Sequence, residues 1–393
     1  MKRRTALTLA LSSVASRARA AEPIKIGALL SYSGVFASIG DEITNAMQLA
    51  FDHAGGTVAG RPITIVRADT EVRPNVALTK ARELVGSDRV DLLVGPVSSS
   101  ESIPLRDFAH QRRIPLIMPH AALDNLFGER CSPYILRTSF SGNQFGRPMA
   151  AWLAQRGVRT ITLMAPDYVG PRDLMEKFEA EFTRQGGQIV GREFTPFQRT
   201  HDFGPYLARV KQQRPDATWV SYGGAEAINF VRQAADFRLS EATRVTGSGW
   251  TVSPLVLPAQ GDAALGFQGL LNYAPSIDTP ENRRFQADYR SRHGRTASEF
   301  GAQGYDTGLF IAAALRALDG RTDDKLALAR AIRDARIVGA RGPARIDPAT
   351  NNIVQNMYIV EVRRGSNGPE LAVLDTMPAV TDEPNGCQMR LEG

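Results

Sequence analysis

This chain of 393 residues has few of the features that mark membrane proteins or metalloproteins. After the N-terminal segment, no stretch reaches the roughly 20 apolar residues that a membrane-spanning helix needs. The longest apolar run, near Leu309–Leu315, has the spacing of an amphipathic helix. The five histidines show no metal-ligand spacing, and neither of the two cysteines has a second ligand nearby. We therefore expect no metal site.

The signatures of common catalytic and nucleotide-binding sites are missing as well. The chain contains no P-loop, no dinucleotide-binding glycine pattern, no nucleophile elbow and no HExxH helix. His201-Asp202 has the composition of a catalytic dyad, but adjacent side chains on a loop rarely point together. We expect no catalytic residues and no cofactor, and an enzyme is the last of the functions considered.

The first 21 residues have the pattern of a secretory signal peptide. A basic start, Met1–Arg4, precedes a short apolar run and the small-x-small sequence Ala18-Arg19-Ala20. We expect residues 1–21 to be removed and the mature chain to be periplasmic. A frayed N-terminus is the alternative.

Charge is nearly balanced once this segment is excluded. The whole chain has 47 basic and 41 acidic residues, a formal net charge of +6 at pH 7. The segment expected to be removed holds five of the basic residues and no acidic one, which leaves +1. A nearly neutral protein has no overall field to attract polyanions, so we expect no nucleic-acid partner.

The two cysteines are Cys131 and Cys387. An exported chain with an even number of cysteines permits a disulfide, which here would join the C-terminal tail to the body. Two unrelated buried thiols are the alternative. We favour the disulfide.

Strand and helix patterns alternate along most of the chain, which predicts parallel sheets covered by helices on both faces. The strands expected in the first half are Ile24–Leu30, Ile63–Val66, Val90–Gly95 and Ile114–Met118. Those of the second half are Thr160–Met164, Ile189-Val190, Ala217–Tyr222, Val245–Gly247 and Asn356–Arg363. Two successive units within a mature chain of about 370 residues predict two lobes. Because no Pro/Gly-rich linker separates them, we expect several chain crossings between the lobes.

The strongest candidate for a binding site is the serine-rich loop Gly95–Ser102, which joins a buried strand to the start of a helix. In open parallel sheets, ligands bind beyond the carboxyl ends of the strands. A helix N-terminus there offers free N–H groups to an anion. Ser98, Ser99 and Ser100 add hydroxyl donors, which indicates a cradle for a carboxylate. Ordinary helix capping by serine is the alternative.

Two more groups follow strands in the same way. The first is the segment with His120, Ala121 and Ala122, for which a tight strand-to-helix turn is the alternative. The second consists of aromatic residues in the second half of the chain: Tyr168, Tyr222 and Trp250. Such rings can close over a ligand, and core packing is their usual alternative role.

Several short motifs occur in a specific order along the chain. They are Ser33-Gly34, Gly40-Asp41, Val94-Gly95-Pro96, Ser98-Ser99-Ser100, Pro115–Pro119, Val220–Gly224 and Gln303–Asp306. In this order they resemble the branched-chain amino acid-binding group of the periplasmic proteins that serve ABC importers. The resemblance extends from Ile24 to Val362, and its specificity lies in the collinear order.

The resemblance implies an α/β fold of the type I periplasmic binding class, with two doubly wound parallel-sheet lobes joined by a hinge of three crossings. The crossings are expected near Ser139–Gly142, Tyr273–Ile277 and Gly342–Ile346. The implied divisions are residues 22–141 with 276–344 for the first lobe, 142–275 with 345–376 for the second, and 377–393 for a tail. That tail would return Cys387 to Cys131.

The resemblance also assigns individual residues. Ser99 corresponds to the serine that binds the ligand carboxylate, Ala121 would present its backbone to the ligand, and Ile39 belongs to the same pocket. Ala122 stands where amino acid-binding relatives have a threonine. The turn Gly247–Trp250 replaces the stretch that carries their ammonium-binding glutamate.

Nothing acidic replaces that glutamate at Gly249, and a buried ammonium group without a partner costs several kcal/mol. The carboxylate end of the site is kept while the amino end is lost. We therefore expect an apolar or aromatic carboxylate, stacked by Trp250 or by Tyr222 and Tyr168, rather than an amino acid.

The function expected from these features is that of an exported, monomeric solute-binding protein. It would capture a small carboxylate in the cleft between the lobes and deliver it to the membrane permease of an ABC importer. Two alternatives remain open. One is an amino acid or amide ligand, with its ammonium group held by backbone carbonyls or water. The other is a ligand sensor that acts on a regulatory partner.

Overall fold

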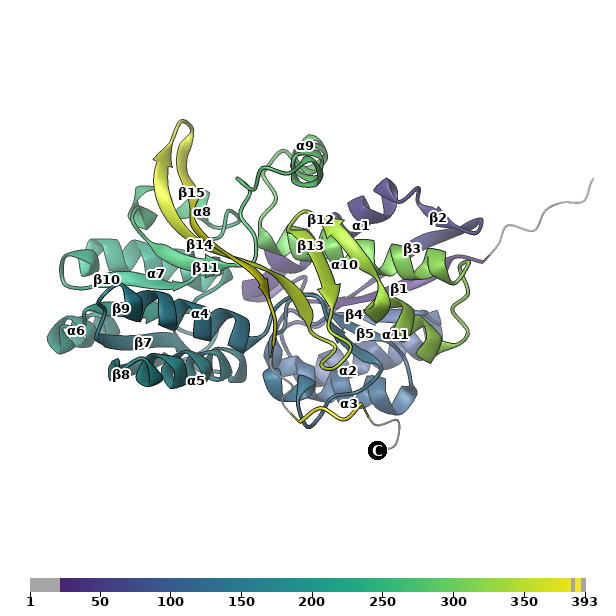
Figure 1. The fold of residues 1–393 in the computed structure, drawn as a ribbon, viewed down its shortest axis with the longest axis horizontal. Coiled ribbons are helices and arrows are strands. Elements are labelled where there is room, and N and C mark those ends of the chain that lie inside the picture. The colour runs from purple at the N-terminus through teal and green to yellow at the C-terminus, as the bar shows by residue number, and fades with distance from the viewer. Residues whose placement is uncertain (1–21, 383–385, 390–393) are drawn as a thin grey trace, which may run out of the picture.

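The computed structural model describes residues 22–382 and 386–389. The expected signal peptide lies outside the described residues. The chain forms two α/β lobes side by side, each built on its own sheet (Figure 1). The two-lobed fold predicted from the alternating pattern is thereby confirmed.

The sheet of the first lobe has the strand order β2-β3-β1-β4-β5-β6, parallel except for the β2–β3 pair. Its strands are β1 (Ile24–Leu30), β2 (Thr57–Val58), β3 (Arg61–Asp69), β4 (Leu92–Val94), β5 (Leu116–Met118) and β6 (Ile135–Arg137). The inner strands are almost wholly buried because helices cover both faces of the sheet.

Six helices of the described chain belong to this lobe. They are α1 (Ala37–His53), α2 (Pro74–Glu83), α3 (Ser102–Arg112), α9 (Pro280–His293), α10 (Glu299–Ala317) and α11 (Lys325–Asp334). The last three come from the late part of the chain, and α9 among them packs on α1 and α10 rather than on the sheet. Helices α1 and α10 lie in close contact, because a Cβ at Gly308 would come within 2.7 Å of the Ala50 Cβ. Only glycine allows the two backbones to approach this closely, so α10 is fixed on the first lobe.

The second sheet has the order β12-β13-β14-β11-β10-β9-β7-β8, with β15 also paired with β14. Strands β12 and β13 belong to the first lobe, whose core contains Ile337, Ala344 and Ile346, so this sheet extends from the second lobe onto the first. Its strands are β7 (Thr160–Pro166), β8 (Gln188–Thr195), β9 (Ala217–Val220), β10 (Arg244–Ser248), β11 (Gln268–Leu271), β12 (Arg336–Gly339), β13 (Gly342–Ile346), β14 (Ile353–Gly365) and β15 (Gly368–Val380). The helices of the second lobe are α4 (Gly142–Gln155), α5 (Val169–Arg184), α6 (Gly204–Gln213), α7 (Gly224–Asp236) and α8 (Leu257–Gln260).

The C-terminal part of this sheet differs from the sequence prediction. The expected final strand is longer, and it continues through a tight turn into β15, so that a long hairpin runs along the second lobe (Figure 1). Position 377, where the tail was expected to begin, falls inside β15. Most residues of β15 are partly or fully exposed, with Leu371 as the buried exception. Such an edge strand lacks the regular burial alternation that a sequence pattern detects.

The chain crosses between the lobes three times: after β6, after β11, and from β13 into β14. The Ser139 carbonyl in the first crossing accepts hydrogen bonds from Asn272 Nδ2 at 3.0 Å and Gln355 Nε2 at 2.6 Å. Arg341 donates to the Thr138 carbonyl at 2.8 Å and to Asp306 Oδ2 at 2.7 Å. All three crossings are therefore joined by one buried hydrogen-bond network.

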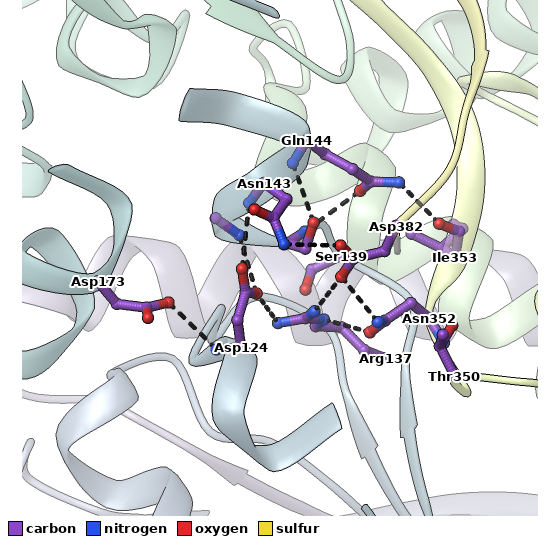
Figure 2. Close-up of polar contacts among 12 residues, drawn as sticks. Asp124, Arg137, Ser139, Asn143, Gln144, Asp173, Thr350, Asn352, Ile353 and Asp382 are labelled. Carbon is purple, nitrogen blue, oxygen red and sulfur yellow. Dashed lines mark hydrogen bonds and ion pairs between the residues drawn. The ribbon is translucent and has the colours of Figure 1, made fainter. Parts of the chain in front are cut away.

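A second buried network lies beside the first crossing (Figure 2). The Arg137 guanidinium donates to Asp124 Oδ1 at 3.0 Å, to Asn352 Oδ1 at 2.7 Å and to Asp382 Oδ2 at 3.4 Å. Asp382 also accepts a bond from Asn143 Nδ2 at 2.8 Å. Because Asp124 accepts the Gly142 and Asn143 amides at the start of α4, the network joins the first lobe, α4 and the C-terminal segment.

Cys131 and Cys387 form a disulfide, which confirms the predicted pairing. Their sequence separation is 256 residues. A loop of this length corresponds to a stabilisation of about 5 kcal/mol in the chain-entropy account. The bond holds the C-terminal segment against the first lobe.

Candidate ligand-binding site

A cavity of about 50 Å³ lies between the two lobes, beyond the carboxyl ends of the strands of both sheets. It is lined by Phe36, Ile39, Val97, Ser99, His120, Ala121, Ala122, Phe140, Gly142, Pro166, Tyr168, Gly170, Pro171, Leu174, Ser221, Gly223, Glu226, Trp250 and Phe300. Parallel sheets place their ligand sites at this edge.

Ser99 is the one member of the serine cluster that lines the cavity. Its Oγ accepts a hydrogen bond from the Ala122 amide at 3.2 Å, which leaves the hydroxyl hydrogen free to donate. Ser98 and Ser100 have another role, because their hydroxyl oxygens lie 2.8 Å apart and Ser98 Oγ accepts the Ser100 amide. The loop therefore combines one donor on the cavity wall with ordinary serine capping behind it.

The second lobe places the start of α5 opposite Ser99. A Cβ at Gly170 would lie 2.8 Å from Ser99 Oγ, so the two lobes meet here with room for glycine alone. Val169 and Gly170, as the first residues of a helix, have amide N–H groups without a partner inside the helix. Gly170 lines the cavity beside Ser99, so the Ser99 hydroxyl and the Gly170 amide define a corner suited to an anion.

Aromatic rings from both lobes form the walls next to this corner. Trp250 stacks on Phe140 with ring centroids 5.2 Å apart, and His120 lies edge-on to Phe300 at 4.9 Å. His120 Nδ1–H donates a hydrogen bond to Gln303 Oε1, 3.0 Å away. Burial lowers the pKa of His120 to about 4, so the ring is neutral near pH 7. No arginine or lysine is among the lining residues.

Glu226, in the first turn of α7, is the acidic residue of the cavity wall. It is 5% exposed, and its Oε1 accepts the Gln198 amide at 2.9 Å. Burial raises the pKa of this carboxyl to about 7. The turn at Gly249 carries no acid, but sequence reasoning missed that α7 brings one into the cavity.

The sequence also assigns the chain to a protein family. The sequence model of the periplasmic binding protein family matches residues 23–369. The chain belongs to the periplasmic binding protein family.

Three similar proteins show how far the likeness extends. A Leu/Ile/Val-binding protein homolog of Brucella melitensis is 28% identical over 94% of this chain and 95% of its own length. A solute-binding protein of an ABC transporter from R. palustris, in complex with benzoate, is 29% identical with a TM-score of 0.88, over 93% of this chain and 99% of that one. Another from Rhodopseudomonas palustris BisB5, in complex with 3,4-dihydroxybenzoic acid, is 31% identical with a TM-score of 0.87, over 92% and 98%. The family and the fold are those of solute-binding transport proteins rather than enzymes.

The structure brings most of the residues expected at the site of this periplasmic binding protein to one place. Those that line the cavity are Ile39, Ser99, His120, Ala121, Ala122, Tyr168 and Trp250. Tyr222 does not line it: the ring stacks on Phe230 at 4.8 Å within the core of the second lobe. Successive side chains of an extended segment point to opposite sides, so Ser221 and Gly223 face the cavity and Tyr222 faces away.

Gly249 also lies outside the cavity wall, because a Cβ there would collide with Leu271 on β11. Sequence reasoning missed several wall residues, among them Phe36, Phe140 and Phe300. Phe140 follows the end of β6, a position of the same kind as the predicted ones. Phe300 lies far along the chain and had no such signal.

Among the described residues, no group of three or more His, Cys, Asp or Glu side chains is arranged to hold a metal ion. In the same part of the chain, every helix is too short or too polar to cross a membrane.

A second buried carboxyl links the lobes away from the cavity. Ser253 Oγ, in the second lobe, donates to Glu299 Oε2 on α10 at 2.8 Å. Burial raises the pKa of Glu299 from 4.5 to about 8. The folded protein therefore holds this proton where the unfolded chain has released it.

The stability contributed by this proton should fall as the pH rises from about 4.5 to about 8, with a slope of at most about 1.4 kcal/mol per pH unit. Glu299→Gln keeps a carbonyl acceptor for Ser253 and removes the titration. We expect the melting temperature of the wild type to fall relative to that of Glu299→Gln across this range. Parallel curves of melting temperature against pH would contradict the assignment.

Proposed function

We propose that this protein is exported to the periplasm, captures a small aromatic or apolar carboxylate between its lobes, and delivers it as a monomer to the permease of an ABC importer. The observation that carries the proposal is the corner formed by Ser99 and Gly170 at the start of α5, which opens onto stacked rings from both lobes.

The chemistry of the wall favours a flat acid. Hydrogen bonds from a hydroxyl and from helix N-terminal amides suit a carboxylate without a basic side chain. Trp250, Phe140 and His120 provide ring faces and edges that pack on an aromatic or branched apolar group. The benzoate and 3,4-dihydroxybenzoic acid in the two similar structures support this ligand class.

Contacts between the lobes support capture by closure. Gly224 at the start of α7 lies so close to the Val35 carbonyl of the first lobe that a Cβ would collide with it. Together with the contact between Gly170 and Ser99, this describes a closed arrangement around the cavity. Release then requires the lobes to move apart about the three crossings.

The first test is titration calorimetry of the ligand-free mature protein with benzoate. Ser99→Ala should weaken benzoate binding about 10- to 100-fold, because it removes one hydrogen bond to a charged group. Ser291→Ala, on the exposed face of α9, is the matched control and should change the affinity by less than about twofold. Equal affinities for wild type and Ser99→Ala would contradict the assigned carboxylate site.

Glu226 favours one second candidate, an amino acid whose ammonium group pairs with this carboxyl. L-leucine and 4-methylpentanoate differ only in the amino group. Titration with both therefore distinguishes an amino acid ligand from a carboxylate ligand that lacks the amino group. Binding of 4-methylpentanoate or benzoate without L-leucine supports the carboxylate proposal. Binding of L-leucine alone overturns it in favour of the amino acid.

A further inference from the structure

We propose that Glu226 selects aromatic acids that carry a hydroxyl group on the ring, at the side of the cavity away from the carboxylate corner. This inference rests on the proposed function. It names the ligand class more narrowly and assigns the residue that sets the preference.

The topology separates Glu226 from the carboxylate corner. Ser99 follows β4 and Gly170 follows β7, whereas Phe36 follows β1 and Glu226 follows β9. In both sheets these are neighbouring strands, because β1 pairs with β4 and β7 pairs with β9. Neighbouring strands lie about 5 Å apart. The cavity therefore has two ends, each built by one element of either lobe.

The end that contains Glu226 is held together by contacts of its own. A Cβ at Gly223 would lie 3.8 Å from Trp250 Cδ1 and 3.9 Å from Phe36 Cε1. Tyr168 stacks on Phe197 at 4.1 Å, and Phe197 lies 5.9 Å from Phe36. Aromatic rings thus extend from the anion corner to Glu226. A flat ring can pack on these aromatic side chains between the two ends.

The Glu226 carboxyl group has capacity for one more partner. Its Oε1 accepts the Gln198 amide, and within the described part of the chain no hydrogen bond reaches Oε2. A ligand that covers Oε2 without donating to it leaves a buried polar atom without a partner, which is unfavourable by about 1–3 kcal/mol. A hydroxyl group on the ligand supplies this partner, whereas an unsubstituted ring leaves it unmade.

The charge state of Glu226 is compatible with an anionic ligand. Its raised pKa, about 7, keeps a large neutral fraction near neutral pH, which limits repulsion of the ligand carboxylate. The titratable side chains near Glu226 are Tyr168 and Tyr222, whose pKa values its charge helps to raise. Neither provides a cation that would hold Glu226 as a simple ion pair.

The test compares benzoate with 3-hydroxybenzoate and 4-hydroxybenzoate by titration calorimetry. In the wild type, at least one hydroxybenzoate should bind about tenfold more tightly than benzoate. Glu226→Ala should reduce this ratio to within about twofold, because it removes the acceptor that distinguishes the hydroxybenzoates from benzoate. Glu226→Gln keeps one carbonyl acceptor and should retain part of the preference. Melting temperatures of both variants show that they are folded.

The outcomes separate the inference from the proposed function. If wild type binds benzoate and both hydroxybenzoates equally, or if Glu226→Ala keeps the preference, the inference is wrong while the aromatic-acid function stands. If Glu226→Ala weakens all three ligands alike, the residue supports the cavity without selecting, and the inference is again wrong. If wild type binds none of them, both the function and the inference fail.

Discussion

Replacing Arg341 by leucine should lower the free energy of unfolding by about 3–5 kcal/mol, because it leaves a buried carboxylate without its partner. Arg341 and Asp306 have side chains with no exposure to solvent, and they pair at 2.7 Å. Arg341 also donates to Gln355 Oε1 at 2.7 Å and to the Thr138 carbonyl at 2.8 Å. Its loss removes bonds that join the crossings as well as the ion pair.

Denaturant titration measures this effect, with Arg364→Leu as the matched control. Arg364 pairs with Asp262 at 2.7 Å, but more than 60% of both side chains is exposed. Surface pairs of this kind contribute about 1 kcal/mol or less. The double variant Arg341→Leu/Asp306→Leu should recover part of the loss, because no lone charge remains buried. Equal losses for Arg341→Leu and Arg364→Leu would contradict the role of the buried network.

Gly170→Val should weaken benzoate binding at least about 100-fold while leaving the fold intact. The Cβ would lie 2.8 Å from Ser99 Oγ and 3.0 Å from Ser99 Cβ, so the lobes could not close without displacing the serine. The same change fills the corner in which the carboxylate is proposed to bind. Gly170 has an ordinary negative φ, so the substitution adds no backbone strain.

Gly86→Val is the matched control, because a Cβ at Gly86, in the turn after α2, meets no atom within 4 Å. Calorimetry should give wild-type affinity for Gly86→Val and none measurable for Gly170→Val, with similar unfolding midpoints for the two. Wild-type affinity in Gly170→Val would show that ligand binds without the closure seen here.

The parts of the site that follow strands were the most predictable. Parallel strands bring their carboxyl ends to one edge, so Ser99, His120 and Trp250 were expected together from their places in the sequence alone. The placement of Tyr222 shows how precisely a sequence pattern can locate a side chain. A shift of one position in an extended segment moves a side chain from the cavity to the core, and sequence patterns locate strand ends less finely than that.

Glu226 was not predicted at the site, for a different reason. It lies on a helix, and whether the first turn of that helix faces the other lobe depends on how the two lobes close. The absence of the glutamate from the turn at Gly249 was visible in the sequence, but the entry of another acid from α7 was not. The ligand preference proposed here depends on that tertiary placement.

The sequence by itself determined the two-lobed α/β fold and the family, because periodicity and motif order are written in the chain, and it favoured the disulfide without deciding it. The tertiary structure decided which side chains meet in the cavity, how β15 completes the sheet, and how Arg341 joins the crossings. These features depend on contacts between residues far apart in the sequence, such as Arg341 with Thr138 at a separation of 203 residues. No local pattern encodes such contacts, because they form only when distant segments of the chain have folded together.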